Sequence, residues 1–257
     1  MVSNPSPLHV TLLYTSRLRG RIQPLPRLFS LLQRERAAAR QIASTVIVLD
    51  LGESCAVNDW LCQATAGRAL LVAMDAFGAD GFYLDRADPL SADPNVLAKL
   101  RAVIVTPVFS EHQPLTINKR IINADSDSTL PIRIAGGDMQ LPAETSNPDL
   151  VPFTLTIRVS RDIPDSEAVR YDPNSQTLWV VDVENDQASR PVGLERITLA
   201  RYRNGAVQVK HQHLEVTSDL PPDPTVSGVV DFVLGEAGYA ARGANRKSGS
   251  NDKADMK

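Results

Sequence analysis

Four carboxylates lie at or just after predicted strand ends, where an α/β protein usually places its chemistry. Asp50 and Glu53 follow one apolar run, and Asp85 and Asp88 follow another. Carboxylate oxygens bind hard divalent cations, so this grouping is compatible with a metal site. Aspartates in such places also cap helices and begin turns, and Asp88 directly precedes a proline. From the residues alone, both interpretations stay open.

Three arginines belong to the same strand-end turns. Arg17 and Arg19 follow the first apolar run of the chain, and Arg86 follows a later one. A guanidinium group has no electron pair to give to a metal ion and always keeps its charge. The arginines are therefore solvated, paired with the neighbouring carboxylates, or grouped as an anion-binding pocket. The cluster so defined comprises Arg17, Arg19, Arg86, Glu53, Asp85 and Asp88.

The histidines and cysteines give weaker indications of a functional site than the carboxylates and arginines. His211 and His213 are two apart on a predicted strand, so they share a face and could bind zinc, although such a pair is more often a solvated strand face. Cys55 and Cys62 are seven apart, which predicts two turns along one helix face and no local disulfide. We therefore expect two free thiols in a reducing cytoplasm.

Composition excludes several function classes. The chain has 257 residues, of which 43% are hydrophobic and 22% charged, as in ordinary globular proteins. Its formal net charge of −3 predicts no general attraction to nucleic acids or acidic membranes. No apolar run approaches the roughly 18 residues of a membrane span. The opening MVSNPSPLHV has neither a basic nor an apolar signal region, so we expect no signal peptide and a cytoplasmic location.

The first half of the chain alternates predicted strands and helices, as in α/β folds. Apolar runs predict buried strands over Val10–Tyr14, Thr45–Leu51, Gly81–Leu84 and Ala102–Phe109. Helical periodicity predicts helices over Leu25–Gln41, from Gly67 onward, and over Val96–Leu100.

The second half is rich in predicted strands. Alternating patterns predict strands over Leu115–Ile122, Leu130–Ile134, Val151–Val159, Thr177–Val183, Leu194–Tyr202 and Ala206–Val216. Asn204-Gly205 is the strongest hairpin signal in the chain. A helix is predicted over Val226–Leu234, and beyond Gly235 the apolar content collapses. We therefore predict one domain over residues 1–235 and a disordered tail over residues 236–257.

Several segments resemble one known family. Thr15-Ser16-Arg17-Leu18-Arg19-Gly20 fits the frame T-N-D-L-H-G, and Leu49-Asp50-Leu51-Gly52-Glu53-Ser54 fits L-D-x-G-D-[ST]. The segment from Gly67 to Leu84 fits a helix and strand that lead into G-N-H-E, here Asp85-Arg86-Ala87-Asp88. Leu194–Leu199, Asn204–Val207 and Leu220–Pro224 resemble the closing segments of the same domain. The chain thus resembles the 5′-nucleotidase and 2′,3′-cyclic phosphodiesterase branch of the calcineurin-like metallophosphoesterases, over about residues 8–109 and 177–235.

The resemblance implies a fold and also the loss of a site. It implies a calcineurin-like β-sandwich flanked by helices in four layers, αββα. The family's metal ligands and catalytic histidine would fall at Arg17, Arg19, Glu53, Arg86 and Ala87, and of these only Glu53 can ligate a metal. The family's Gly-His motifs are also missing, because no Gly-His pair occurs in the sequence. The resemblance therefore implies no resident metal or other cofactor and no catalytic residue.

We therefore expect a catalytically inactive homologue that acts as a binding, scaffold or regulatory subunit, with a protein partner or as a homo-oligomer. One alternative is a remodelled phosphoesterase that keeps residual activity through Glu53, Asp50 and Asp88. Another is an anion-binding module in which the arginines hold phosphate or a nucleotide. The three hypotheses differ in whether the chain binds metal, turns over phosphoesters or only binds anions.

Overall fold

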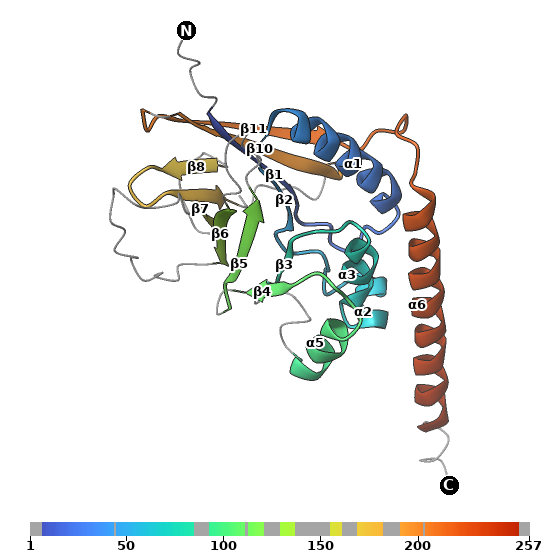
Figure 1. Cartoon of the computed structure of the whole chain (residues 1–257). Helices are drawn as coiled ribbons and strands as arrows, with labels where there is room; N and C mark the ends of the chain where they lie inside the picture. Colours follow the sequence, from blue (N-terminus) through green and yellow to red (C-terminus); the bar gives the residue numbers. More distant parts are fainter. Residues whose placement is uncertain are drawn as a thin grey trace.

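Two β-sheets lie face to face in the computed structural model, with helices on one outer side (Figure 1). The structure describes residues 7–43, 45–84, 93–110, 113–120, 129–136, 155–160, 169–181, 191–202 and 204–251. Over these residues the chain has an α+β architecture with two mixed sheets, as the alternation of helices and strands followed by further strands predicts.

The first sheet has six strands in the order β11-β10-β1-β2-β3-β4. They are β1 (Leu8–Thr15), β2 (Thr45–Asp50), β3 (Gly81–Leu84), β4 (Val108–Ser110), β10 (Gly193–Arg201) and β11 (Val207–Glu215). The strands β1 to β4 run parallel, and β10 and β11 join β1 as an antiparallel pair. Strand β1 therefore lies between the parallel and the antiparallel half of the sheet.

The second sheet has five strands in the order β5-β6-β7-β9-β8. They are β5 (Leu115–Arg120), β6 (Thr129–Gly136), β7 (Leu155–Ser160), β8 (Val169–Asp172) and β9 (Thr177–Val181). Strand β8 was not predicted, because its four residues VRYD are too short and polar to give an alternating pattern.

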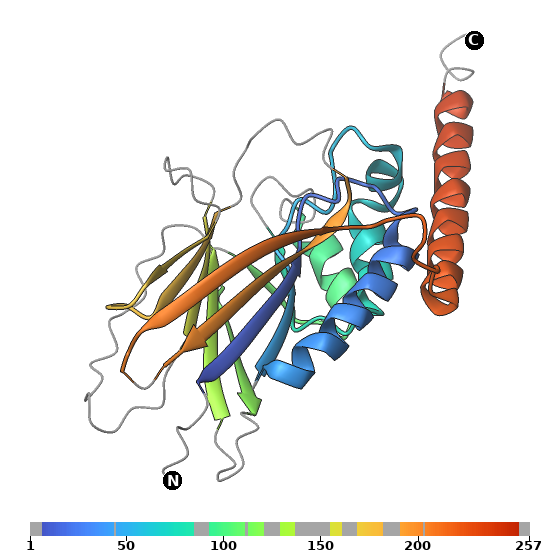
Figure 2. The ribbon, with the colours of Figure 1, turned by 90° about the horizontal axis from the view of Figure 1, so that it is seen from above.

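The helices pack on the first sheet. They are α1 (Leu25–Ile42), α2 (Trp60–Thr65), α3 (Arg68–Asp75), α5 (Pro94–Arg101) and α6 (Pro224–Asn251). Helix α6 contacts α1, α2 and α3 and stands at the outer edge of the molecule (Figures 1 and 2). No helix in the described ranges is long and apolar enough to cross a membrane.

Two apolar cores follow from this arrangement. One core lies between the first sheet and the helices, and the other lies between the two sheets. Side chains of β1 point alternately into the two cores: Leu13 packs against the helices, whereas Val10, Leu12 and Tyr14 pack against the second sheet. The described helices all lie on the same side of the first sheet (Figure 2). The described residues therefore form three layers, a helical layer and two sheets, where the family resemblance implied four.

The strand predicted over Ala102–Phe109 is wrong for most of its length. Only Val108–Ser110 forms β4, whereas Val103 is 65% and Val105 92% exposed. Helix α5 ends at Arg101, and the segment after it turns, where the backbone N–H groups of Val105 and Thr106 donate to the Asp75 carboxylate. An apolar run alone does not distinguish a buried strand from such a connection.

The tail predicted to be disordered over residues 236–257 is helical as far as Asn251, where α6 ends, and residues 252–257 lie outside the described residues. Ala237 lies beyond the predicted boundary and is fully buried, in line with Val226, Val230 and Val233. The low apolar content of the tail suggested a coil. The packed segment up to Ala237 has already paid the cost of nucleation, however, so the polar segment continues an existing helix and need not start one.

Candidate functional site

The turns that follow β1 and β2 are joined by their backbones. Because Thr15 and Asp50 end neighbouring parallel strands, the two chains leave the sheet side by side. The N–H groups of Arg17, Arg19 and Gly20 donate to the carbonyls of Gly52, Glu53 and Ser54 at 2.9, 3.0 and 2.9 Å. Arg17, Arg19 and Glu53 all have φ between 49° and 55°, which costs energy in non-glycine residues. The turns are thus held in a conformation that the isolated segments would not favour.

Glu53 is held by both arginines of the first turn. Its Oε2 accepts from Nε and a terminal nitrogen of Arg19 at 3.1 and 2.9 Å, and Arg17 Nε lies 3.8 Å from the same oxygen. The Arg17 side chain is 5% exposed and that of Glu53 18%, whereas Arg19 is 38% exposed, so solvent reaches the Arg19–Glu53 pair from the Arg19 side. Glu53, the carboxylate for which the sequence resemblance implied a metal-ligand position, is therefore engaged by guanidinium groups.

Asp50 is a structural residue of the strand ends. It is 1% exposed; its Oδ2 accepts from the Thr15 hydroxyl at 2.7 Å, and its Oδ1 accepts from Gly52 N–H and the Ser54 hydroxyl. These bonds tie β1, β2 and the second turn together. Because the carboxylate is buried among these donors, it is poorly placed to receive a cation from solvent.

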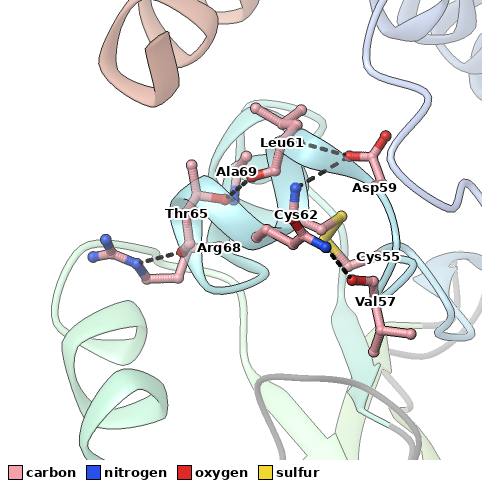
Figure 3. Close-up of a disulfide and its surroundings, with 9 residues drawn as sticks. Cys55, Val57, Asp59, Leu61, Cys62, Thr65, Arg68 and Ala69 are labelled. Atoms are coloured by element: carbon pink, nitrogen blue, oxygen red, sulfur yellow. Dashed lines mark hydrogen bonds between the residues drawn. A yellow bond between two sulfur atoms is a disulfide. The ribbon is translucent and has the colours of Figure 1, made fainter. Parts of the chain in front are cut away.

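The prediction of free thiols is wrong, since Cys55 and Cys62 form a disulfide (Figure 3). Only Cys62 belongs to α2; Cys55 lies in the turn that leads to it. The chain folds back between them, which brings their Cα atoms to 5.6 Å. The seven-residue spacing was interpreted as two helical turns, whereas in fact it closes a loop directly after Glu53.

Asp59 connects this disulfide loop to the first turn. Its Oδ1 accepts from the N–H groups of Leu61 and Cys62 and so caps α2 (Figure 3). Its carboxyl group also lies against Gly20, where a Cβ atom would fall 2.3 Å from Asp59 Cγ. The glycine, which has φ of +89°, therefore leaves room for the capping carboxylate.

A second carboxylate, Glu195 on β10, is held by the two histidines of β11. Its Oε2 lies 2.8 Å from His211 Nε2 and its Oε1 lies 2.7 Å from His213 Nδ1. A carboxylate only accepts, so each of these ring nitrogens carries the hydrogen. His211 also stacks on Tyr14 of β1, with ring centroids 6.5 Å apart. The histidine pair thus forms a partly buried polar cluster with Glu195 and is not a fully solvated strand face.

Only one ring nitrogen of His213, Nδ1, is engaged by Glu195. Its Nε2 is buried, and no hydrogen-bond partner is found for it in the described structure. The ring lies against Gly193, where a Cβ atom would come within 2.5 Å of His213 Cε1. A buried polar atom without a partner is costly, and water or a ligand commonly supplies one.

A small pocket of about 30 Å³ lies between the two carboxylate clusters. It is lined by Ser16, Arg17, Leu18, Arg21, Pro191, Val192, Gly193, Glu195 and His213. Arg21 donates from Nε to Leu18 O and from a terminal nitrogen to Arg17 O, at 3.1 and 2.9 Å. Burial and the nearby charge of Arg19 lower the pKa of Arg21, as expected where cations crowd. The pocket has room for one small polar group, such as a water or an oxygen of an anion.

The structure thus brings together Arg17, Arg19 and Glu53, and it sets Asp50 apart from them in the sheet. Asp85, Arg86, Ala87 and Asp88 lie outside the described residues, so the larger cluster stays a prediction. Within the described ranges, no three His, Cys, Asp or Glu side chains gather in the manner of a metal site.

Glu195, Arg21 and Gly193 were not predicted as site residues. The Asn204-Gly205 turn predicts the β10–β11 hairpin, but counting outward from a two-residue turn would pair Glu195 with Leu214. The structure instead pairs Glu195 with His213, because the last strand pair is Arg201 with Val207. The bonds from Arg21 to backbone carbonyls and the close contact between Gly193 and His213 depend on tertiary packing, so no sequence pattern predicts them.

Comparison with known proteins adds no family or relative, because no protein-family model and no curated protein matches the chain.

Proposed function

We propose that this chain is a catalytically inactive homologue of the calcineurin-like metallophosphoesterases that works as a binding or scaffold subunit. The two facing sheets and the parallel strands β1 to β4, with the Arg17–Arg19 and Glu53 turns following β1 and β2, support a fold of that kind. The fold alone does not carry the activity, so the proposal depends on what occupies these turns.

The observation that carries the proposal is the pairing of Glu53 with Arg19 and Arg17. Metal-assisted phosphoester hydrolysis needs cations that activate water and neutralise the phosphoryl oxygens. Guanidinium groups could neutralise a phosphate, but they cannot lower the pKa of a bound water as a metal ion does. They also repel a divalent cation that approaches Glu53.

The same geometry disfavours the remodelled hydrolase. That alternative uses Glu53 and Asp50 as ligands together with Asp88. Asp50 is 1% exposed and its oxygens already accept from Thr15, Gly52 and Ser54. A metal ion would have to break both this network and the Arg19–Glu53 pair.

The test is to supply metal and measure both binding and turnover. We expect no hydrolysis of nucleoside monophosphates, 2′,3′-cyclic nucleotides or p-nitrophenyl phosphate above the blank, with or without added Mn²⁺. An Arg17→Asp and Arg19→His double variant, which restores donor atoms at both positions, should bind Mn²⁺ more tightly than the wild type in calorimetry. Turnover by the wild type that is lost in Glu53→Gln would overturn the proposal.

The pocket supports a second candidate function, the binding of a small oxyanion. Arg17, Arg21 and the spare Nε2 of His213 line it, and a protonated Nε2 can donate to an anion. Inorganic phosphate should then raise the unfolding temperature at constant ionic strength, and His213→Gln should reduce that shift. An equal shift with sulfate, phosphate and chloride in both proteins would show general salt stabilisation instead.

The disulfide favours an oxidising compartment for this subunit over the cytoplasm expected from the sequence. Disulfides persist in secreted, periplasmic and surface proteins and are rare where glutathione keeps thiols reduced. The expectation of a cytoplasmic chain depended partly on two free thiols, and the described structure has no free cysteine.

A further inference from the structure

Helix α6 carries two parallel stripes on opposite sides. The first stripe packs on the body of the protein and consists of Val226, Val230, Val233 and Ala237, at 0 to 5% exposure. The second stripe faces outward and consists of Gly228, Phe232, Gly235 and Tyr239. Each of its residues follows a buried one by two positions, about 200° around a helix. Both stripes have the four-three-four spacing with which helices pack against each other.

The outward stripe exposes two large aromatic side chains. Phe232 is 61% and Tyr239 76% exposed, although aromatic side chains gain most from burial. Between them lies a hollow lined by Asp231, Phe232, Gly235, Glu236 and Tyr239. A ridge of aromatic rings that alternates with glycine hollows is the shape that a second, similar helix can fill.

The glycines of this stripe have no explanation within one chain. A Cβ atom added at Gly228 or Gly235 would meet nothing within 4 Å. Glycine is among the poorest helix formers, so alanine would suit an isolated exposed helix better at both positions. Glycine is favoured where another backbone or ring must come close to the helix.

The position of α6 leaves this stripe open. The helix stands at the edge of the molecule, with its packed side toward α1, α2 and α3 (Figures 1 and 2). Ala237 is its last buried residue among those whose burial is described, yet the helix runs on to Asn251. A helical extension of this kind, rich in glycine and polar residues, is marginal in water without a packing partner.

We propose that the outward stripe of α6 binds the same stripe of a second copy of this chain, as an antiparallel helix pair. In such a pair, with Gly235 of both copies at the centre, the two Gly235 residues face each other and allow a close approach, and Phe232 of each copy lies nearly level with Tyr239 of the other. The contact is self-complementary, as a twofold dimer requires.

Charge selects the antiparallel orientation. Asp231 and Glu236 flank the stripe, and Arg242 continues it by the next three-residue step. Antiparallel pairing about Gly235 brings Arg242 of one copy level with Gly228 of the other, one helical turn from Asp231. Parallel pairing would set Asp231 against Asp231 and Arg242 against Arg242, which is unfavourable. The proposal does not depend on the function of the strand-end turns, and its failure would leave that function untouched.

The first test is the mass of the full chain in solution, by light scattering and sedimentation equilibrium across the micromolar range. We expect a dimer that dissociates on dilution, and a monomer with unchanged circular dichroism for Phe232→Ser with Tyr239→Ser. Val105→Ser, which removes a 92% exposed apolar side chain far from α6, is the matched control and should stay dimeric. A wild type that is monomeric throughout overturns the proposal and leaves another protein as the occupant of the stripe.

Two further variants separate a close helix pair from loose apolar contact. Gly235→Ala should weaken the dimer at least tenfold while raising the helix content of the monomer, whereas Gly238→Ala, off the stripe, should raise helix content without weakening the dimer. Arg242→Glu should weaken an antiparallel dimer, and Asp231→Arg added to it should restore the association. Equal effects of the two glycine variants, or tighter association of Arg242→Glu alone, would overturn the antiparallel pair.

Discussion

Two carboxylates on the same end of the first sheet are each held by two basic side chains, and the difference between them is instructive. Glu53 is held by Arg19 and Arg17, and Glu195 by His211 and His213. Guanidinium groups keep their charge at all relevant pH, whereas imidazole can gain or lose a proton near neutrality. The Glu53 cluster is therefore fixed in charge and structural in character. In the Glu195 cluster, by contrast, His213 lines the pocket, and no partner of its buried Nε2 is found among the described residues.

Each cluster also depends on one glycine. Gly20 leaves room for Asp59 beside the Glu53 turn, and Gly193 leaves room for the ring of His213. The Glu53 cluster has a further support in the disulfide, which closes the loop after it. We infer that the Glu53 side is stabilised mainly by backbone hydrogen bonds between the two turns and by the disulfide, and the Glu195 side mainly by hydrogen bonds between side chains.

The largest effect that would test this comparison is expected from Gly20→Ala. The new Cβ atom adds left-handed backbone strain and a clash with Asp59, which together should lower the free energy of unfolding by about 2–4 kcal/mol. Chemical denaturation measures the change. Gly205→Ala is the matched control, because Gly205 has φ of +81° but nothing within 4 Å of the added atom. Equal losses in the two variants would mean that contact with Asp59 adds nothing.

A somewhat smaller effect is expected from removing the disulfide by Cys55→Ser with Cys62→Ser. Closing a loop of this length lowers the entropy of the unfolded chain, so its loss should cost roughly 2–3 kcal/mol. Thermal and chemical unfolding of the variant should match those of the wild type under reducing conditions, and reductant should not affect the variant further. Two alkylatable thiols in the native, unreduced protein would contradict the disulfide itself.

Hydrophobic periodicity predicted some helices and strands well and others poorly. Hydrophobic period identified β1, β2, α1 and the β10–β11 hairpin closely, because burial repeats along a regular element. It failed at Ala102–Phe109, where apolar residues lie in a connection, and at α6, where a buried stripe continues into a polar segment. The spacing of apolar residues does not show where packing against a neighbouring segment lengthens or ends a helix or strand.

The candidate sites were predictable to a lesser degree. The family resemblance implied that Arg17, Arg19 and Glu53 would lie close together, and they do so because the parallel strands β1 and β2 end side by side. The disulfide was missed because a spacing of seven was interpreted as helical, although Cys55 precedes the capping residue Asp59. Reading the Asp59 cap as the start of the helix would have placed Cys55 outside it.

The smallest and most discriminating effect comes from the same substitution in both carboxylates. Glu195 uses both oxygens, one for each histidine, so Glu195→Gln leaves one histidine facing an amide N–H₂, and that ring must move its hydrogen to its other nitrogen or lose the bond. With the Glu195 side chain 9% exposed, this mismatch should cost about 1–3 kcal/mol. Arg19 donates twice to a single oxygen of Glu53, so Glu53→Gln keeps an acceptor and loses mainly charge. Because Arg19 is 38% exposed, we expect a loss of about 1 kcal/mol or less.

Salt separates the two losses by their physical origin. Raising the ionic strength screens a partly exposed ion pair, so the difference between Glu53→Gln and the wild type should shrink in urea unfolding with added NaCl. The loss in Glu195→Gln should persist, since a buried donor facing a donor is a failure of hydrogen bonding that screening does not relieve. Glu215→Gln, at the exposed end of β11, controls for the general effect of removing one negative charge. If Glu53→Gln instead proves the more damaging and the less sensitive to salt, then Glu53 behaves as the buried carboxylate that contributes more to stability. Glu195 would then be the partly exposed one, which is the reverse of what we expect.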